Sequence, residues 1–223
     1  MSNSDLGRSA WQIEEQDEPY SLPIVVHLEK DSVADEREFY KAVALSMANL
    51  VVEPRWEESV AAWMAGRFRK VVRKARGAAW SKATSAAENI HTVTSNGAEV
   101  AIFEPHKISS VPDHIRKLQV QGIDFPNVTP VNVEDVYSAD GLTVVVSINP
   151  ELEMSSGKVA AQVAHATQLL FMKSEAEKVV KWIESGASFE VVEWENAPNT
   201  VEIVDAGLTE IPAGSFTVKS GWV

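Results

Sequence analysis

Three polar side chains in the second half of the chain have types and positions that could support chemistry. Lys158 falls in the first turn of a predicted helix that follows a predicted strand, so its ammonium group and the unpaired N–H groups of the helix end face the same space. That space would stabilise an anion or a developing oxyanion. Asp205 ends a predicted strand just before Gly207, near the carboxyl ends of the strands, where open α/β sheets place their ligands. Thr209 follows shortly after, and the three residues form the candidate site.

Each of these residues also has a purely structural interpretation. A lysine in the first turn of a helix is most often solvated, and an aspartate before Ala-Gly can simply shape a turn. Gln162 and His165 lie one and two turns beyond Lys158 on nearly the same helical face, so they could extend the candidate surface. His165 fits a packing histidine equally well. The residues alone leave these alternatives open.

Two longer sequence patterns surround these residues. Type 2 peptidyl-tRNA hydrolases enter their first helix with the pattern Met-x-x-Gly-Lys-hydrophobe-Ala-Ala-Gln-x-x-His-Ala, which resembles Met154-Ser-Ser-Gly-Lys-Val-Ala-Ala-Gln-Val-Ala-His-Ala166. Their Asp-Ala-Gly-Arg-Thr-Gln turn, followed by Gly-Ser-x-Thr, is similar to Asp205-Ala-Gly-Leu-Thr-Glu-Ile-Pro-Ala-Gly-Ser-Phe-Thr217. The resemblance therefore rests on two separate segments in the right order, and it covers residues 142–219.

The resemblance implies a hydrolase that cleaves the ester bond between tRNA and a peptide or N-blocked aminoacyl group, without a cofactor or metal ion. Ester hydrolysis requires a positioned water, a group that accepts its proton and donors for the tetrahedral oxyanion. The resemblance makes Asp205 the group that orients the water or accepts its proton, and Lys158 the electrostatic stabiliser. Thr209 would hold water or substrate through its hydroxyl. Gln162 and His165 would extend the surface toward the tRNA 3′ end.

Two positions depart from the family pattern. Leu208 and Glu210 stand where the family has Arg and Gln, which makes the site less favourable to phosphate. The principal alternative is therefore a non-catalytic member of the same fold that acts as a binding or interaction protein. Hydrolysis of a small ester or amide unrelated to tRNA is a third function class that stays open.

Hydrophobic periodicity predicts strands alternating with helices in both halves. In the first half it predicts a strand at residues 23–29, helices at 37–52 and 56–66, a strand at 68–75, a helix at 78–90 and strands at 99–104 and 118–123. In the second half it predicts a strand at 142–148, helices at 157–172 and 175–185, and strands at 189–194, 201–204 and 215–223. Such alternation indicates an α/β fold, a mixed β-sheet with flanking helices.

The shared order of elements predicts a tandem, degenerate repeat of the type 2 peptidyl-tRNA hydrolase fold. Residues 23–52 match 142–172, 56–66 match 175–186, 68–72 match 189–192, and 99–104 match 201–205. Residues 35–38 lie opposite Lys158 and residues 104–106 lie opposite Asp205, so the first half has no working copy of the site. Members of the family are commonly homodimers, and the resemblance therefore suggests an intramolecular pseudo-dimer. A monomeric pseudo-dimer and a homodimer both stay open.

The domain organisation that follows has four parts. They are a mobile acidic tail at residues 1–22, a degenerate hydrolase-like repeat at 23–125, a linker at 126–141 with two prolines and an acidic run, and a peptidyl-tRNA hydrolase-like domain at 142–223.

A formal net charge of −12 and a pI near 4.9 argue against general nucleic-acid binding, because affinity for phosphate backbones comes largely from Lys and Arg. Residues 67–82 nevertheless carry only basic charges: Arg67, Arg69, Lys70, Arg73, Lys74, Arg76 and Lys82. Four of these, Arg69, Lys70, Arg73 and Lys74, could track the phosphates of a tRNA partner. A solvated, charged edge strand fits equally well. Attraction to the acidic strand around Glu190, Glu193 and Glu195 is a further alternative.

The composition, with 45% hydrophobic and 23% charged residues, is that of a globular protein. The chain has no cysteine, which excludes disulfides, a thiolate nucleophile and a zinc site built on sulfur. The histidines lack ligand spacing, so we expect no metal site. No stretch approaches the roughly 20 apolar residues that span a bilayer, and the polar N-terminus does not resemble a signal peptide. We therefore expect no membrane attachment and a cytoplasmic location.

Overall fold

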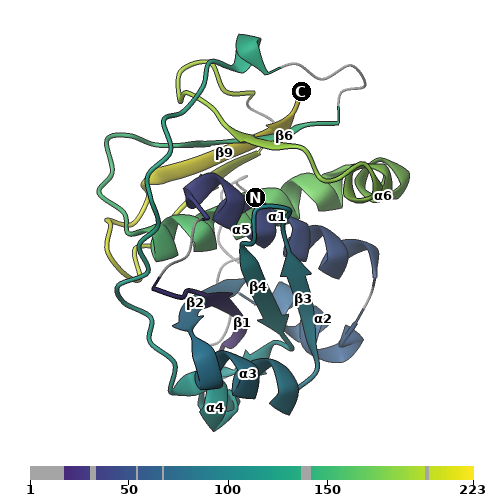
Figure 1. Ribbon diagram of the computed structural model, residues 1–223, viewed down its shortest axis with the longest axis vertical. Coiled ribbons are helices and arrows are strands. Elements are labelled where there is room, and N and C mark those ends of the chain that lie inside the picture. The colour runs from purple at the N-terminus through teal and green to yellow at the C-terminus, as the bar shows by residue number, and fades with distance from the viewer. Residues whose placement is uncertain (1–17, 31–33, 54, 67, 137–141, 199–200) are drawn as a thin grey trace, which may run out of the picture.

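The computed structural model describes residues 18–30, 34–53, 55–66, 68–136, 142–198 and 201–223. Within these ranges the chain forms two separate mixed sheets with helices packed on them (Figure 1). This confirms the predicted α/β class. Among the helices of the described ranges, none is long and apolar enough to cross a membrane.

The first sheet has the strand order β2-β1-β4-β3. Its strands are β1 (Tyr20–His27), β2 (Arg69–Ala75), β3 (Asn89–Val93) and β4 (Glu99–Phe103), and β5 (His106–Lys107) pairs with the start of β1. β1 runs parallel to β2 and antiparallel to β4, while β3 and β4 form an antiparallel hairpin. The apolar residues of β1 predicted this central position, because a strand between two others buries both of its faces.

The second sheet has the strand order β7-β6-β9-β8. Its strands are β6 (Val144–Ile148), β7 (Phe189–Val191), β8 (Val201–Val204) and β9 (Phe216–Trp222). β6 runs parallel to β7 and antiparallel to β9, and β8 pairs antiparallel with β9. The order and the directions of these four strands are therefore the same as those of β2, β1, β4 and β3.

Two long helices, α1 (Glu36–Val52) and α5 (Ser156–Lys173), lie side by side between the two sheets (Figure 1). Each follows the central strand of its sheet and begins with a capping side chain. Asp35 accepts a hydrogen bond from the backbone N–H of Glu38 at 3.0 Å, and Ser155 accepts one from the backbone N–H of Lys158 at 3.2 Å. These caps satisfy backbone donors that a helix end would otherwise leave unpaired, and they fix where each helix starts.

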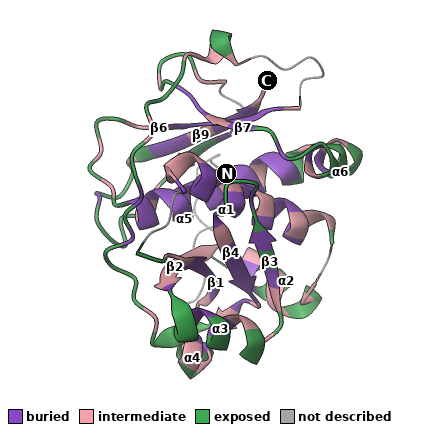
Figure 2. Cartoon of the chain, viewed as in Figure 1, coloured by how far each residue is buried: buried purple, intermediate pink, exposed green. Residues whose placement is uncertain are grey.

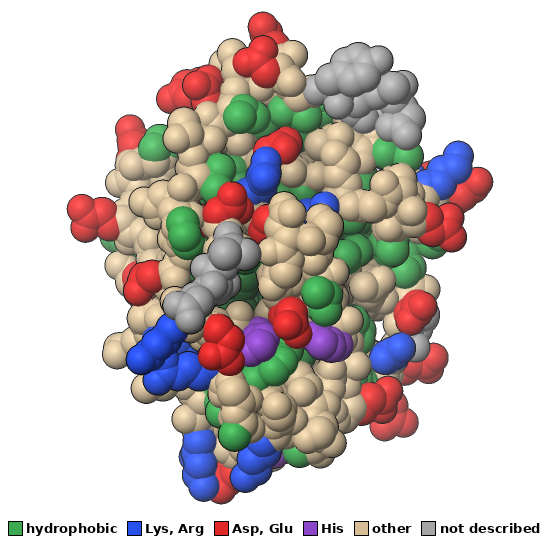
Figure 3. Space-filling view, in the orientation of Figure 1, with side chains coloured by type: hydrophobic (Ala, Val, Ile, Leu, Met, Phe, Trp, Pro, Cys, Tyr) green, Lys and Arg blue, Asp and Glu red, His purple; other side chains and the backbone are tan. Residues whose placement is uncertain are grey.

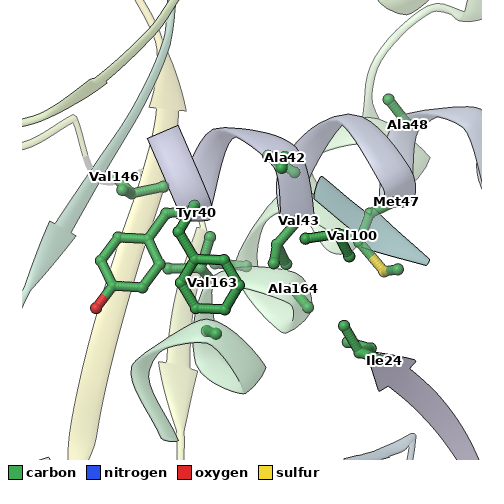
Figure 4. Close-up of a cluster of buried hydrophobic side chains, with 14 of the residues drawn as sticks. Ile24, Tyr40, Ala42, Val43, Met47, Ala48, Val100, Val146, Val163 and Ala164 are labelled. Carbon is green, nitrogen blue, oxygen red and sulfur yellow. The ribbon is translucent and has the colours of Figure 1, made fainter. Parts of the chain in front are cut away.

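The α1–α5 contact forms the main hydrophobic core, which is continuous between the two halves of the chain. Figure 4 shows Tyr40, Val43 and Met47 of α1 beside Val163 and Ala164 of α5, with side chains from both sheets on either side. Figure 2 shows the same distribution, since burial is concentrated in α1, α5 and the strands. Each large apolar side chain buried here stabilises the fold by about 1.5–3 kcal/mol.

Two shorter helices, α2 (Glu57–Ala65) and α6 (Ala176–Glu184), precede the parallel edge strands β2 and β7. Each buries one tryptophan that donates its indole N–H to a backbone carbonyl six residues later. Trp63 donates to Arg69 at 2.8 Å, and Trp182 donates to Ser188 at 2.7 Å. Five residues after each tryptophan, Phe68 and Ala187 both have positive φ, at 50° and 53°. The turn into the edge strand is thus built in the same way in both halves.

A smaller hydrophobic cluster covers the outer face of the first sheet under α3 (Gly77–Ala86) and α4 (Asp113–Arg116). Trp80 of α3 and Ile115 of α4 pack there against Val25 and Phe103. The remaining short elements are the 3-10 turns η1 (Ile108–Ser110) and η2 (Val133–Asp135). In the described part of the chain, the connection from β7 to β8 contains no counterpart of α3.

The sequence-based boundaries are wrong at three places. β1 begins at Tyr20, inside the predicted tail of residues 1–22, and Leu22 is fully buried; residues 1–17 of that tail lie outside the described ranges. The predicted helix at 78–90 ends at Ala86, and residues 89–93 form β3. Its alternation of buried and exposed side chains is typical of an edge strand. Residues 118–123 contribute only an isolated bridge between Gln119 and Lys74, not a strand.

These differences change which segments correspond between the halves. β3 occupies the edge position that β8 occupies in the second sheet, and β4 occupies the position of β9. The match of residues 99–104 to 201–205 is therefore wrong. The residue that follows β3, in the place that Asp205 takes after β8, is Thr94 and not a residue of the 104–106 segment.

The two tryptophan anchors and the continuous core lead to a prediction about cooperativity. Trp63→Phe and Trp182→Phe each remove an indole donor and leave a carbonyl without its partner, so each should lower the free energy of unfolding by about 1–3 kcal/mol. Because one core joins the halves, both variants should retain a single unfolding transition in urea, followed by fluorescence and circular dichroism. Two separate unfolding transitions, each shifted to lower urea by only one of the two variants, would contradict the claim that one core joins the halves.

Candidate active site

The structure brings Lys158, Asp205 and Thr209 together. Lys158 Nζ donates to Asp205 Oδ2 at 2.7 Å and to Thr209 Oγ1 at 3.1 Å. Lys158 comes from the first turn of α5, while the other two residues lie on the loop that follows β8. The three residues singled out from the sequence thus form one hydrogen-bonded group, at the end of the second sheet where α5 begins.

The turn that carries Asp205 depends on a glycine. Asp205 Oδ1 accepts the backbone N–H of Gly207 at 2.7 Å, and the Asp205 carbonyl accepts that of Gly214 at 2.8 Å, so the loop closes on itself. Gly207 has φ of 73°, and a Cβ there would lie 2.5 Å from the backbone nitrogen of Ala213. Only glycine fits this conformation and this close approach. The Asp-Ala-Gly sequence therefore fixes the direction of the carboxylate.

Gln162 holds the second oxygen of the same carboxylate. Its Nε2 donates to Asp205 Oδ2 at 2.6 Å, and its Oε1 accepts from Thr217 Oγ1 at 3.1 Å. Both Gln162 and Thr217 are buried. Gln162 therefore orients Asp205 from within the protein. Sequence reasoning did not select Thr217 as a site residue, although it completes the Gly-Ser-x-Thr segment that was matched to the family.

The Lys158–Asp205 pair is shielded from solvent, with side-chain exposures of 8% and 9%. Burial by itself raises the pKa of the Asp205 carboxyl, but the hydrogen bond from Lys158 and the backbone N–H of Gly207 outweigh it. Coulombic attraction to Lys158 and the hydrogen bond from Gln162 act in the same direction, so the pKa of Asp205 lies below its ordinary value. Asp205 is therefore ionised at neutral pH and is a weak proton acceptor.

His165 has a different environment from the one that the resemblance implied. Its Nδ1 lies 3.1 Å from Lys70 Nζ, which also donates to Gln168 Oε1 at 2.8 Å and sits 4.7 Å from the centre of the Trp63 ring. Burial lowers the pKa of His165 well below its ordinary value, and the charges of Lys70 and Lys158 lower it further. The imidazole is therefore neutral. It links α5 to β2 of the first half and makes no hydrogen bond to Asp205.

Two other basic residues of β2, Arg73 and Lys74, also make hydrogen bonds within the protein. Arg73 donates to the carbonyls of Arg116 and Leu118 at 3.0 and 2.9 Å, and Lys74 donates to that of Gly122 at 2.5 Å. Arg69 is half-buried at the start of β2, and its Nε has no hydrogen-bond partner among the described residues. Arg67 lies outside the described ranges. Contact of Arg69, Lys70, Arg73 and Lys74 with tRNA phosphates stays a prediction.

The acidic strand of the second half was expected to attract β2, but its ion pair is with α1. Glu190 of β7 pairs with Arg37 of α1 at 3.3 Å, across the two halves.

On the face shown in Figure 3, Lys and Arg side chains gather toward the lower end, around α3 and α4, while Asp and Glu are spread over the rest. Among the described residues, no group of three or more His, Asp and Glu could hold a metal ion.

Comparisons with known proteins relate the second half of the chain to one family. The family model "Peptidyl-tRNA hydrolase PTH2" matches residues 142–203. A peptidyl-tRNA hydrolase of Methanothermobacter thermautotrophicus is 32% identical, over 33% of this chain and 78% of that protein. One of Thermococcus onnurineus is 36% identical, over 33% of this chain and 76% of that protein. No solved structure was found to match the chain.

The chain therefore belongs to the type 2 peptidyl-tRNA hydrolase family, through its second half. Lys158, Gln162 and His165 lie inside the segment that the family model matches, and Asp205 and Thr209 follow directly after it.

The low pKa of Asp205 predicts how this carboxylate contributes to stability. A depressed pKa means that the folded protein releases the proton more readily than the unfolded chain, whose Asp pKa is about 3.9. The contribution is therefore complete above that value and is lost as the pH falls through the folded pKa. The stability advantage of the wild type over Asp205→Asn should shrink between about pH 5 and pH 2 in urea denaturation. A stability difference between the wild type and Asp205→Asn that stays constant over this pH range would contradict this prediction. So would the same loss of stability difference in Asp124→Asn, which changes an exposed carboxylate.

Lys70 gives a prediction at alkaline pH. Burial lowers the pKa of Lys70 well below its ordinary value, so in the window between the folded and unfolded pKa the unfolded chain binds more protons. The contribution of Lys70 to stability then rises with pH, by up to about 1.4 kcal/mol per unit until about pH 10. Relative to Lys70→Met, the wild type should gain stability between pH 7 and pH 9.5, whereas the same comparison with Lys82→Met at an exposed position should not change. Equal pH profiles for Lys70→Met and the wild type would refute the burial of the ammonium group.

Proposed function

We propose that this protein hydrolyses the ester bond that links a peptide or N-blocked aminoacyl group to tRNA. The observation that carries the proposal is the ammonium group of Lys158, held by Asp205 and Thr209 at the start of α5. An ammonium nitrogen has three N–H donors, and the described residues accept two of them. The third is available to the oxygen of a substrate carbonyl.

This arrangement supplies what ester hydrolysis needs most, a positive charge that is fixed before the reaction. Attack by water on the ester carbon places negative charge on the carbonyl oxygen, and a preorganised donor stabilises that oxyanion at little reorganisation cost. Collapse of the intermediate breaks the bond to the ribose oxygen, which takes up the proton that the water gives up. Lys158 is therefore the electrostatic stabiliser in this mechanism.

Asp205 has the role of orienting group. Its low pKa makes it a poor acceptor for the proton of water, whereas its carboxylate holds the ammonium group of Lys158 in place. Thr209 accepts a hydrogen bond from Lys158, so its hydroxyl proton is free to bind the attacking water or the substrate. Of the two roles first considered for Asp205, the geometry supports orientation over general base.

The first half is proposed to be a degenerate repeat of the same fold, which makes the chain an intramolecular pseudo-dimer. Three features support this: the identical strand order and directions of the two sheets, the equivalent capped helices α1 and α5, and the matching anchors Trp63 and Trp182. At the position after the cap that Lys158 takes in α5, α1 has Glu38, which is buried. The repeat would therefore contribute a scaffold, with Lys70 placed against His165 of α5, and no second catalytic group.

The partner implied by this function is tRNA, which translation supplies in the cytoplasm. We propose that the negative charge of the chain is overcome locally by Lys158 and by Arg69 on the edge strand β2. The net acidity and Leu208, which replaces the arginine of the family pattern, favour the alternative of a non-catalytic binding protein. Catalysis and binding without turnover differ in one measurable quantity, the release of the acyl group.

Release of N-acetyl-aminoacyl groups from tRNA by the purified protein tests the proposal. The wild type should turn over many substrate molecules, and Lys158→Ala and Asp205→Ala should each lower kcat/KM by roughly a hundredfold or more, as for loss of an oxyanion donor. Lys173→Ala, at the exposed far end of α5, is the matched control and should retain activity. Equal, near-background release by all four proteins would leave the non-catalytic alternative as the function.

A further inference from the structure

Glu210 binds the start of α5 with both oxygens of its carboxylate. Oε2 accepts the backbone N–H of Ser155 at 2.9 Å, and Oε1 accepts the Ser155 hydroxyl at 2.9 Å. Ser155 is the capping residue of α5, and its Oγ in turn accepts the backbone N–H of Lys158. Glu210 is thus connected, through a single residue, to the turn of helix that carries Lys158.

The same loop contacts the same turn of α5 a second time. Thr209, the neighbour of Glu210 in sequence, accepts a hydrogen bond from Lys158 Nζ. Two adjacent loop residues therefore contact the first turn of α5. Glu210 binds the capping residue Ser155, and Thr209 binds the side chain of Lys158. The tip of the loop is otherwise exposed between residues 206 and 210, and its next buried side chain is Ile211.

An exposed loop segment has many conformations, and fixing it in one requires contacts that offset the lost entropy. Loss of the Glu210–Ser155 contact would leave the Thr209 hydroxyl as the remaining hydrogen bond between the tip of the loop and α5. The carboxylate is well suited to this role because it offers an acceptor to each Ser155 donor and lies at the positive end of the helix dipole. The replacement of the family's Gln by Glu at this position is then a strengthened contact, not a charge aimed at the substrate.

We propose that Glu210 is a positioning residue, whose bidentate contact with Ser155 clamps the 205–214 loop onto the start of α5 and thereby holds the Thr209 hydroxyl on Lys158. The inference rests on the proposed hydrolase function for its kinetic consequence. Its structural consequence, an ordered loop, is independent of turnover.

Two substitutions at Glu210 separate the clamp from the charge. Glu210→Ala removes both acceptors, whereas Glu210→Gln keeps one acceptor oxygen and adds a donor that can reach the Ser155 hydroxyl. Glu210→Ala should lower kcat roughly tenfold to a hundredfold, as expected for a misplaced catalytic group, and change KM by less than about threefold. Glu210→Gln should restore most of kcat. Glu202→Ala, an exposed acidic residue on the neighbouring strand β8, is the matched control and should leave both constants unchanged.

Hydrogen exchange measured by mass spectrometry gives a readout without substrate. Amides of residues 206–214 should exchange faster in Glu210→Ala than in the wild type, with Glu210→Gln between them. The loss of kcat in the double variant Ser155→Ala/Glu210→Ala should be smaller than the product of the two single losses, because both changes break the contact between Glu210 and the Ser155 hydroxyl.

Unchanged exchange in Glu210→Ala would overturn the proposal. An effect confined to KM, with Glu210→Ala and Glu210→Gln both binding tRNA more tightly, would also overturn it, because the carboxylate would then act by repelling phosphate. If the wild type releases no acyl group at all, the hydrolase function fails, and the clamp is judged on exchange alone. Faster exchange in Glu210→Ala then supports the clamp, and unchanged exchange refutes it.

Discussion

The packing of α1 against α5 is the contact on which the rest of this structure depends. It lies between the two sheets and buries apolar side chains from both halves of the chain in one core. Because α5 is held along its length, its first turn has a fixed position, and that turn carries Lys158. The same packing brings β2 of the first half against α5, where Lys70 meets His165. Residues far from Lys158 in the sequence thus determine where its side chain lies.

At the candidate site, a few groups donate hydrogen bonds to the buried carboxylate of Asp205. Asp205 receives hydrogen bonds from Lys158, Gln162 and the backbone of Gly207, and Thr217 fixes Gln162 from behind. A buried ion pair is costly unless its remaining hydrogen-bonding capacity is used, and here each described member has a partner. The pair is therefore rigid, and rigidity is what electrostatic stabilisation of an oxyanion requires. The Glu210–Ser155 contact extends the same principle to the exposed side of the loop.

The sequence predicted the class of fold, most elements and the grouping of Lys158, Asp205 and Thr209, because these depend on local patterns. Continuous apolar runs marked the central strands, and Lys158 and Asp205 stood in segments that resemble a known family. It did not predict β3, which is short and follows an alanine-rich helix without a strong turn signal, so residues 99–104 were matched to β8 in its place. Contacts between segments distant in the chain were also out of reach. The contact of Lys70 with His165 and the hydrogen bonds between Glu210 and Ser155 join residues that are distant in the chain. No local sequence pattern indicates either of them.

The account requires Lys158 and Asp205 to act as a unit, and a double-mutant cycle on kcat/KM for N-acetyl-aminoacyl-tRNA tests this most directly. If Asp205 acts by holding Lys158, the Lys158→Ala/Asp205→Ala variant should be no less active than the weaker single variant. The wild type should exceed all three by roughly a hundredfold or more. Losses that multiply in the double variant would show that the two residues act independently, and a wild type no more active than the double variant would contradict the site's catalytic role.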